Sequence, residues 1–331
     1  MRHRSVSARL IGVALSALSA LTLVAPASAQ QIVIDPELPR FEQQGAVNGQ
    51  LTSIGSDTML NLMNQWFQLF QETYPAVQAS AEGKGSSTAP PALIANQAQF
   101  GPMSRAMDPE EIAQFAAARG FEPTPLIVSI DCIAIFVHAD NPIESISVDQ
   151  LADAFSVAGP SNVTWGDLGV TEANYRDRPV SLYGRNSASG TYKYFKEEAL
   201  GGVDYRPQVS DNPGSSGVVN AISRDPYGLG YSGAGFSVAG VKIVPVKFTK
   251  NDAAFLPTQE HAETGNYPFA RPLWLYVAFD PRDELDTLRR RFIEMIFTRE
   301  GQNVVAQDGA YPVSADLARE QLEYVGIVPD F

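Results

Sequence analysis

One segment of the sequence places a permanent cation and several hydroxyl groups at the start of an expected helix. It reads GRNSASGTYKYF, residues 184–195, and follows an apolar run at 180–183 that is typical of a strand. A helix over 192–200 that begins there would present backbone N–H groups without intrahelical acceptors, at the positive end of its dipole. Arg185 adds a planar fork of donors that suits an oxyanion. These features predict an anion site, although ordinary helix capping explains the serine and threonine equally well.

Three further turns carry the same kind of side chain. They are Ser56-Asp57-Thr58, Ser86-Ser87-Thr88 and Met103-Ser104-Arg105, and Ser189-Gly190-Thr191 is the fourth. Most of them follow an expected strand, such as those over 51–54 and 77–81. Ligands of open α/β sheets bind where the carboxyl ends of the strands gather, so we expect the four turns to surround one small polar ligand. None of the turns matches the phosphate loop of nucleotide enzymes or a dinucleotide fingerprint.

The elements between these turns alternate between strand and helix, which is typical of an α/β fold. The first turn should lead into an amphipathic helix, with Ser56 or Asp57 as its N-cap. Further helices are expected over 89–99, 147–155, 284–297 and 298–307, and between Asp108 and Gly120. Residues 100–105 are expected to form a polar turn, and residues 30–49 a loosely held arm.

The apolar run at 126–137 is long, almost uninterrupted and rich in β-branched residues. We expect it to be either a buried parallel strand or a strand that crosses between domains. Roughly 300 residues follow the N-terminal signal described next, which is too many for one average core and favours two domains.

The N-terminus has the features of a secretory signal peptide. Residues 1–29 combine a basic start, an apolar stretch at 10–24 and the small residues Ala27-Ser28-Ala29, so we expect export and cleavage near Ala29. A retained anchor is the alternative, but the apolar stretch is short for a membrane span. Cleavage would change the formal net charge from −13 to −16, since it removes three arginines and no acidic residue. This charge argues against a nucleic-acid partner.

Little in the sequence supports redox, metal or nucleophilic chemistry. Cys132 is the only cysteine, so an intrachain disulfide cannot form. Beyond the signal peptide, the histidines are His138 and His261, which lack the spacing of zinc ligands or of a catalytic triad. We therefore expect no metal, no cofactor and no enzymatic activity. A secreted phosphatase with Ser56 or Ser189 as nucleophile is the rival from another class, but it would lack a paired histidine or a metal cluster.

Taken together, the turns and several later motifs resemble the periplasmic phosphate-binding proteins, the receptors of high-affinity phosphate ABC transporters. The resemblance covers nearly the whole chain after the signal peptide. The motifs occur in the order and spacing of that family: Gly55-Ser56-Asp57-Thr58 with Trp66, Gly85-Ser86-Ser87, Phe100-Gly101 before Ser104-Arg105, Arg185 before Ser189-Gly190-Thr191 and Phe195, Gly228-Leu229-Gly230-Tyr231, and Glu300-Gly301-Gln302 before Gly309-Ala310-Tyr311-Pro312.

The resemblance implies a two-lobed α/β fold of the periplasmic binding protein kind (type II, Venus-flytrap), with crossover hinge strands, that closes on a dehydrated phosphate. Lobe I would comprise residues 50–129 and 270–331, and lobe II residues 130–269. The hinge strands would lie within 126–137 and 268–279. The implied partners are inorganic phosphate and the permease subunits of an ABC transporter, and we expect a periplasmic or secreted monomer. The closest rival keeps the fold and binds sulfate or another tetrahedral oxyanion.

The resemblance also implies which residues bind phosphate. By position in the motifs they are Asp57, Thr58, Ser86 and Ser104 from lobe I and Arg185, Ser189, Gly190 and Thr191 from lobe II, with Ser56 of the first turn beside them. Two departures from the family stand out. Ser104 replaces an aspartate that accepts the ligand's proton, and Ser187 replaces an acid beside the arginine. Asp57 is the available substitute acceptor, which would favour phosphate over sulfate; alternatively, it only caps its helix.

Overall fold

The computed structural model describes residues 32–331, so the expected signal peptide lies outside the described residues. The strands of the described part are β1 (Gly49–Gly55), β2 (Val77–Gly83), β3 (Phe100–Met103), β4 (Thr124–His138), β5 (Ile146–Ser147), β6 (Ser181–Arg185), β7 (Ser210–Asn212), β8 (Gly228–Gly233), β9 (Val241–Val244), β10 (Val246–Lys247) and β11 (Ala270–Val277). The α-helices are α1 (Leu60–Thr73), α2 (Ala89–Ile94), α3 (Pro109–Arg119), α4 (Val148–Phe155), α5 (Gly190–Leu200), α6 (Gly214–Ile222), α7 (Gln259–Glu263), α8 (Thr287–Ile296), α9 (Arg299–Asp308) and α10 (Ala315–Glu323).

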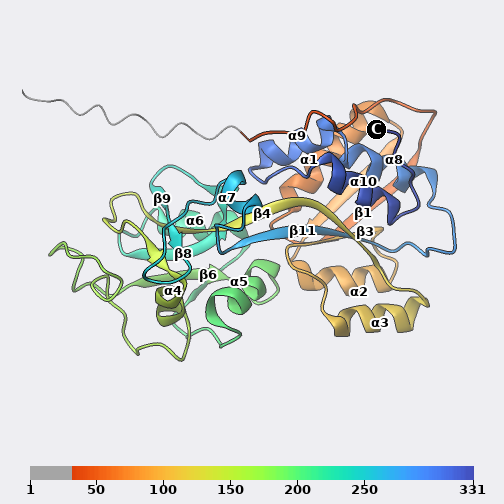
Figure 1. The fold of residues 1–331 in the computed structure, drawn as a ribbon. Coiled ribbons are helices and arrows are strands. Elements are labelled where there is room, and N and C mark those ends of the chain that lie inside the picture. The colour runs from red at the N-terminus through yellow and green to blue at the C-terminus, as the bar shows by residue number, and fades with distance from the viewer. Residues whose placement is uncertain (1–31) are drawn as a thin grey trace, which may run out of the picture. The chain divides into compact units, whose positions relative to one another are not determined.

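Most of the strands belong to one mixed sheet in the order β2-β1-β3-β11-β4-β8-β6-β7, with β9 paired to β4 (Figure 1). At one end β1 is parallel to both β2 and β3, and at the other β6 is parallel to both β7 and β8. The carboxyl ends of β1, β2 and β3 therefore meet at one edge, where three of the hydroxyl-rich turns begin. The predicted α/β class is confirmed.

The strands β4 and β11 run side by side and connect the two parallel groups (Figure 1). The first part of β4 pairs with β11 and its last part with β8 and β9, and all of these pairings are antiparallel. Of the two expectations for residues 126–137, the buried parallel strand was therefore wrong. The almost uninterrupted apolar run has another cause, because β4 contributes side chains to two separate hydrophobic cores along its length.

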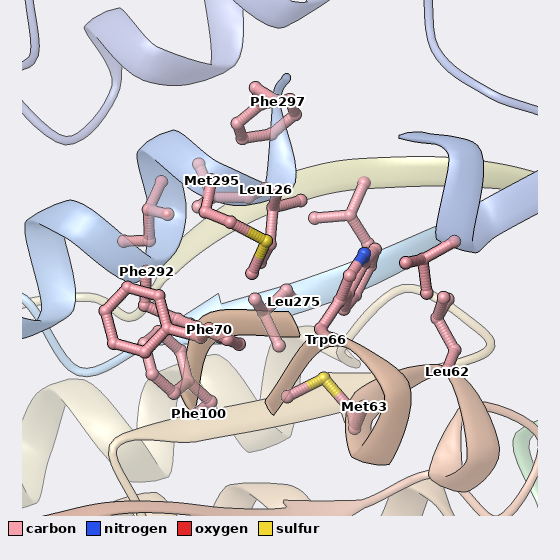
Figure 2. Close-up of a cluster of buried hydrophobic side chains, with 14 of the residues drawn as sticks. Leu62, Met63, Trp66, Phe70, Phe100, Leu126, Leu275, Phe292, Met295 and Phe297 are labelled. Atoms are coloured by element: carbon pink, nitrogen blue, oxygen red, sulfur yellow. The ribbon is translucent and has the colours of Figure 1, made fainter. Parts of the chain in front are cut away.

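The first core packs α1, α8 and α9 against the sheet (Figure 2). The rings of Phe70 and Phe100 each lie within 5.4 Å of the ring of Phe292. Trp66 is fully buried and donates from its indole Nε1 to the carbonyl of Gly301, at 2.8 Å. The predicted apolar stripe of the first helix is thus the face that anchors α1 to α9.

The second core packs against the segment over residues 184–195, in which the sequence predicts an anion site. It includes Phe155 of α4, Phe195 of α5 and Tyr231 of β8. The rings of Phe195 and Tyr231 are stacked with centroids 3.9 Å apart, so the first turns of α5 are held firmly against the sheet.

Several predicted boundaries were wrong for local reasons. The helix α1 begins at Leu60 with Met59 in the N-cap position and no side-chain cap, so neither Ser56 nor Asp57 caps it. The helix α2 ends at Ile94 rather than at Gln99, because the chain turns through Asn96, whose φ is +55°. The residues 100–103 then form β3 instead of a polar turn, since parallel pairing with β1 and antiparallel pairing with β11 stabilise the extended chain.

The arm over residues 32–49 is held by specific contacts, which corrects the expectation of a loose segment. Leu38 is fully buried, its carbonyl accepts from Arg299 Nε at 2.7 Å, and the Phe41 N–H donates to the Glu300 carboxylate at 2.8 Å. The Asp35 carboxylate accepts the N–H of Ala315 at the start of α10, and this bond lowers the pKa of Asp35. Among residues 32–331, no helix has the length and apolar character needed to cross a membrane.

Candidate functional site

The turns after β2 and β3 meet through their serine side chains. The hydroxyl oxygens of Ser86 and Ser104 lie 3.3 Å apart, and the N–H of Ser104 donates to Ser86 Oγ at 3.0 Å. The turn after β1 joins them, because the N–H of Ser56 donates to the carbonyl of Pro102 at 2.8 Å. Ser56, Ser86 and Ser104 are fully buried. The predicted convergence of these three turns is confirmed.

The fourth turn, between β6 and α5, packs directly onto the other three. Thr191 Oγ1 lies 3.0 Å from Thr58 Oγ1, and both side chains are buried. Gly190 lies against Ser86 and Ser104 at the point where α5 begins. One buried cluster therefore contains hydroxyl groups from segments that are far apart in the sequence.

Arg185 and Asp57 form a buried ion pair within this cluster. Arg185 is the last residue of β6, and its Nη1 also donates to Ser215 Oγ at 2.6 Å. Within residues 32–331, Arg185 Nε and Asp57 Oδ1 have no hydrogen-bond partner, whereas Arg185 Nη2 faces Asp57 Oδ2 in the ion pair. Buried polar atoms are costly to leave unpaired, so these atoms mark a place where a polar ligand would be stabilised. Donors on one side and a carboxylate acceptor on the other suit an oxyanion that carries a proton.

Asp57 is the acid that partners the arginine of this chain. Ser187 is exposed, whereas only 9% of the Asp57 side chain is accessible. The carboxylate of Asp57 pairs with Arg185, and no side chain among the described residues caps α1. Ser56 Oγ accepts the N–H of Met59, the residue that precedes the helix. The sequence left two roles open for Asp57, a helix cap and a hydrogen-bond acceptor for the ligand. In the structure Asp57 does not cap α1.

The N-terminus of α5 faces the same cluster. Ser189 is its N-cap and accepts the N–H of Thr191 at 3.2 Å, so the capping interpretation is correct for this serine. Capping by Ser189 does not exclude an anion site, because the first turn of a helix has more N–H groups than one side chain can satisfy. The phenol of Tyr231 accepts the N–H of Arg185 at 3.4 Å, and burial raises its pKa, so the phenol stays neutral.

The sequence reasoning missed three residues at this site. Ser215 lies at the start of α6 and contacts Arg185, and its signal was another glycine- and serine-rich turn after a strand. Arg271 and Asp131 form a buried ion pair on β11 and β4, with Arg271 Nη2 2.8 Å from Asp131 Oδ2. Their signal was a pair of opposite charges inside two otherwise apolar runs. Arg105 lies apart from the cluster, since its guanidinium pairs with the Glu111 carboxylate at 2.7 and 2.8 Å.

Comparison with known proteins defines the class to which this fold and site belong. Residues 42–300 match the family model of a PBP superfamily domain. A solved ABC-type phosphate transport receptor from Vibrio cholerae aligns with a TM-score of 0.63 at 19% identity, over 80% of this chain and all of that one. A phosphate-binding protein from Stenotrophomonas maltophilia aligns with a TM-score of 0.57 at 14% identity, over 82% of this chain and 92% of that one. The fold is the two-lobed, type II fold of periplasmic binding proteins.

Sequence comparison narrows the class to one family. Phosphate-binding protein PstS of Pseudomonas aeruginosa is 42% identical over 319 residues, which cover 94% of this chain and 98% of that protein. A protein of the same name from Staphylococcus haemolyticus is 25% identical over 274 residues, or 82% of this chain and 83% of that one. The chain therefore belongs to the PstS family of phosphate-binding proteins.

Proposed function

We propose that this protein is the non-enzymatic phosphate receptor of an ABC transporter and binds inorganic phosphate between its two lobes. The observation that carries the proposal is the buried Arg185–Asp57 pair, whose unpartnered atoms lie among hydroxyl groups and next to the N-terminus of α5. The relatives support phosphate as the anion, since the Pseudomonas aeruginosa protein is named for it.

In this proposal the lobes are those expected from the sequence, residues 50–129 with 270–331 and residues 130–269. The two separate hydrophobic cores and the passage of β4 from one core to the other support this division. The strands β4 and β11 would act as the hinge, because they carry the backbone from one core to the other.

The proposed ligand contacts come from both lobes. They are Ser56, Asp57, Thr58, Ser86 and Ser104 on the first side and Arg185, Ser189, Gly190 and Thr191 on the second. Arg185 would bind two phosphate oxygens through its fork, and the hydroxyl and N–H groups would donate to the others. Asp57 would accept the hydrogen bond of a protonated phosphate oxygen.

This last contact would discriminate between anions. Phosphate at neutral pH keeps at least one proton, whereas sulfate keeps none. A fixed carboxylate would therefore form a hydrogen bond with phosphate and repel sulfate, which is discrimination by an unfavourable contact. Delivery to membrane permease subunits, export to the periplasm or beyond, and a monomeric state complete the proposal.

Calorimetric titration of the purified protein, first with phosphate and then with sulfate, tests the proposal. We expect saturable one-to-one binding of phosphate and much weaker binding of sulfate. Tight binding of sulfate with weak binding of phosphate would support the rival oxyanion receptor. Hydrolysis of a phosphate monoester with burst kinetics would support the secreted phosphatase instead.

A further inference from the structure

We infer that Arg271 is a positioning residue for the proposed anion site: it orients the Thr191 hydroxyl as a hydrogen-bond donor and holds the two sides of the site together. The inference rests on the proposed function, because it concerns how that site is organised. Arg271 lies on β11, directly opposite Asp131 in the register of β11 and β4, and its side chain is almost completely buried.

The guanidinium of Arg271 donates hydrogen bonds to three separate segments of the chain. Its Nη2 donates to Thr191 Oγ1 at 2.8 Å, and its Nη1 donates to the carbonyl of Ser104 at 2.7 Å. Its Nε and Nη2 donate to Asp131 Oδ2 at 3.2 and 2.8 Å. Arg271 thus connects the turn after β3, the first turn of α5 and the paired strands β4 and β11. The guanidinium also lies 5.4 Å from the ring centre of Tyr194, which limits its movement further.

The chemistry of arginine decides the direction of the bond to Thr191. A guanidinium has only donors, so Thr191 Oγ1 must be the acceptor in that bond. The other polar contact of this oxygen is Thr58 Oγ1 at 3.0 Å. Either hydroxyl can be the donor in the bond between the two threonines. The hydrogen of the other hydroxyl then remains free for donation to an anion. A bond received from a cation also polarises the Thr191 hydroxyl and makes it a stronger donor.

The charge of Arg271 is not its main contribution. Asp131 lies against the guanidinium and compensates its charge, so the pair adds little net attraction for an anion. Arg185 is also paired with a carboxylate, that of Asp57, but its Nε has no hydrogen-bond partner among residues 32–331 and can still donate to a ligand. The effect of Arg271 on an anion must therefore pass through the groups that it holds, above all through Thr191.

A double-mutant cycle tests this dependence. Phosphate affinity is measured by calorimetry for the wild type, Arg271→Lys, Thr191→Val and the double variant. Lysine keeps a charge near Asp131 but lacks the fork that also reaches Thr191 and Ser104. We expect each single change to weaken binding about 10- to 100-fold, as the loss of a hydrogen bond to a charged group would. The double variant should bind about as weakly as Thr191→Val alone, because the two residues act in series.

Two results would overturn the inference. Unchanged phosphate affinity in Arg271→Lys would show that the arginine does not organise the site. If the fold losses of phosphate affinity in the two single variants multiply in the double variant, the Arg271–Asp131 pair is purely structural and acts independently of Thr191. Thr191→Ser serves as the rescue variant and should restore both the affinity and its dependence on Arg271.

Two controls separate folding from binding. Melting curves without phosphate accompany every titration. If the protein does not fold with lysine at position 271, the combined change Arg271→Gln with Asp131→Asn replaces Arg271→Lys in the cycle, because this combination leaves no buried unpaired charge. A wild type that fails to bind phosphate would refute the proposed function and this inference together. If the wild type binds phosphate but the fold losses of affinity multiply in the double variant, only the inference is refuted.

Discussion

Gly190 and Ser86 approach each other so closely that no side chain fits between them. A Cβ atom placed on Gly190 would lie 2.3 Å from Ser86 Oγ and 2.6 Å from Ser104 Oγ. Gly190 does not need glycine for its backbone angles, since it is not among the described residues with positive φ. It needs glycine because two segments of the proposed site meet there.

Gly190→Ala should therefore prevent this contact and weaken phosphate binding. We expect a loss of about 1–3 kcal/mol, the usual cost of one extra methyl group in a packed site. Calorimetry would measure the affinity, and small-angle scattering would show whether phosphate still makes the molecule more compact. Gly217→Ala in α6 is the matched control, because its Cβ would have its nearest contact at 3.5 Å. Equal affinity of Gly190→Ala and the wild type would contradict the proposed closure.

Arg185→Ala should remove the principal cation of the site. We expect phosphate binding to weaken by about 2–5 kcal/mol, on the scale of other buried charge contacts. Arg206→Ala is a useful comparison, since Arg206 is also buried but its side chain donates to the carbonyls of Asp153 and Ser156, away from the proposed site. That control should lower the melting temperature without changing the affinity of the folded protein. If Arg185→Ala binds phosphate like the wild type, the site has been misplaced.

Asp57→Asn should change selectivity more than stability. The amide keeps the shape of the side chain but no longer repels sulfate, so phosphate should bind more weakly and sulfate should compete better. The loss for phosphate should be about 1–3 kcal/mol, the cost of an altered buried hydrogen bond. Competition titrations with both anions would measure the ratio of affinities. An unchanged ratio would assign the selectivity to other residues.

Asp308 should make the stability of the protein depend on pH. Burial raises the pKa of this carboxyl from 3.8 to about 6, and Asn61 Nδ2 donates to it at 2.5 Å. The folded protein therefore holds this proton more tightly than the unfolded chain, and ionisation costs stability as the pH rises from about 4 to about 6. Asp308→Asn should raise the free energy of unfolding at pH 7 by up to about 2 kcal/mol. Urea unfolding at several pH values would test this.

The same experiment contains its own control. Below the lower end of that window the carboxyl is protonated in both states, so the wild type and Asp308→Asn should have similar stability there. A constant difference between the two proteins at every pH would show that the carboxyl does not titrate in this range.

Features that depend on neighbouring residues could be predicted from the sequence. The apolar stripe of α1, the bounds of α3 between Asp108 and Gly120, and the hydroxyl-rich turns follow from side-chain periodicity and local hydrogen bonding. These local patterns also indicated the α/β class and the anion site at Arg185. The sequence by itself thus determined which turns form the proposed site, and the motifs placed the chain in its family.

The tertiary structure alone decided how those residues are paired. Whether Asp57 caps α1 or meets Arg185 depends on how β1 and β6 are placed in one sheet, which no local pattern specifies. The antiparallel pairing of β4 with β11 likewise puts Arg271 beside Asp131, where its fork reaches both Ser104 and Thr191. Such contacts join segments far apart in the chain, and their geometry comes from strand order and packing rather than from residue types. The turns could therefore be read from the sequence, but the bonds among them could not.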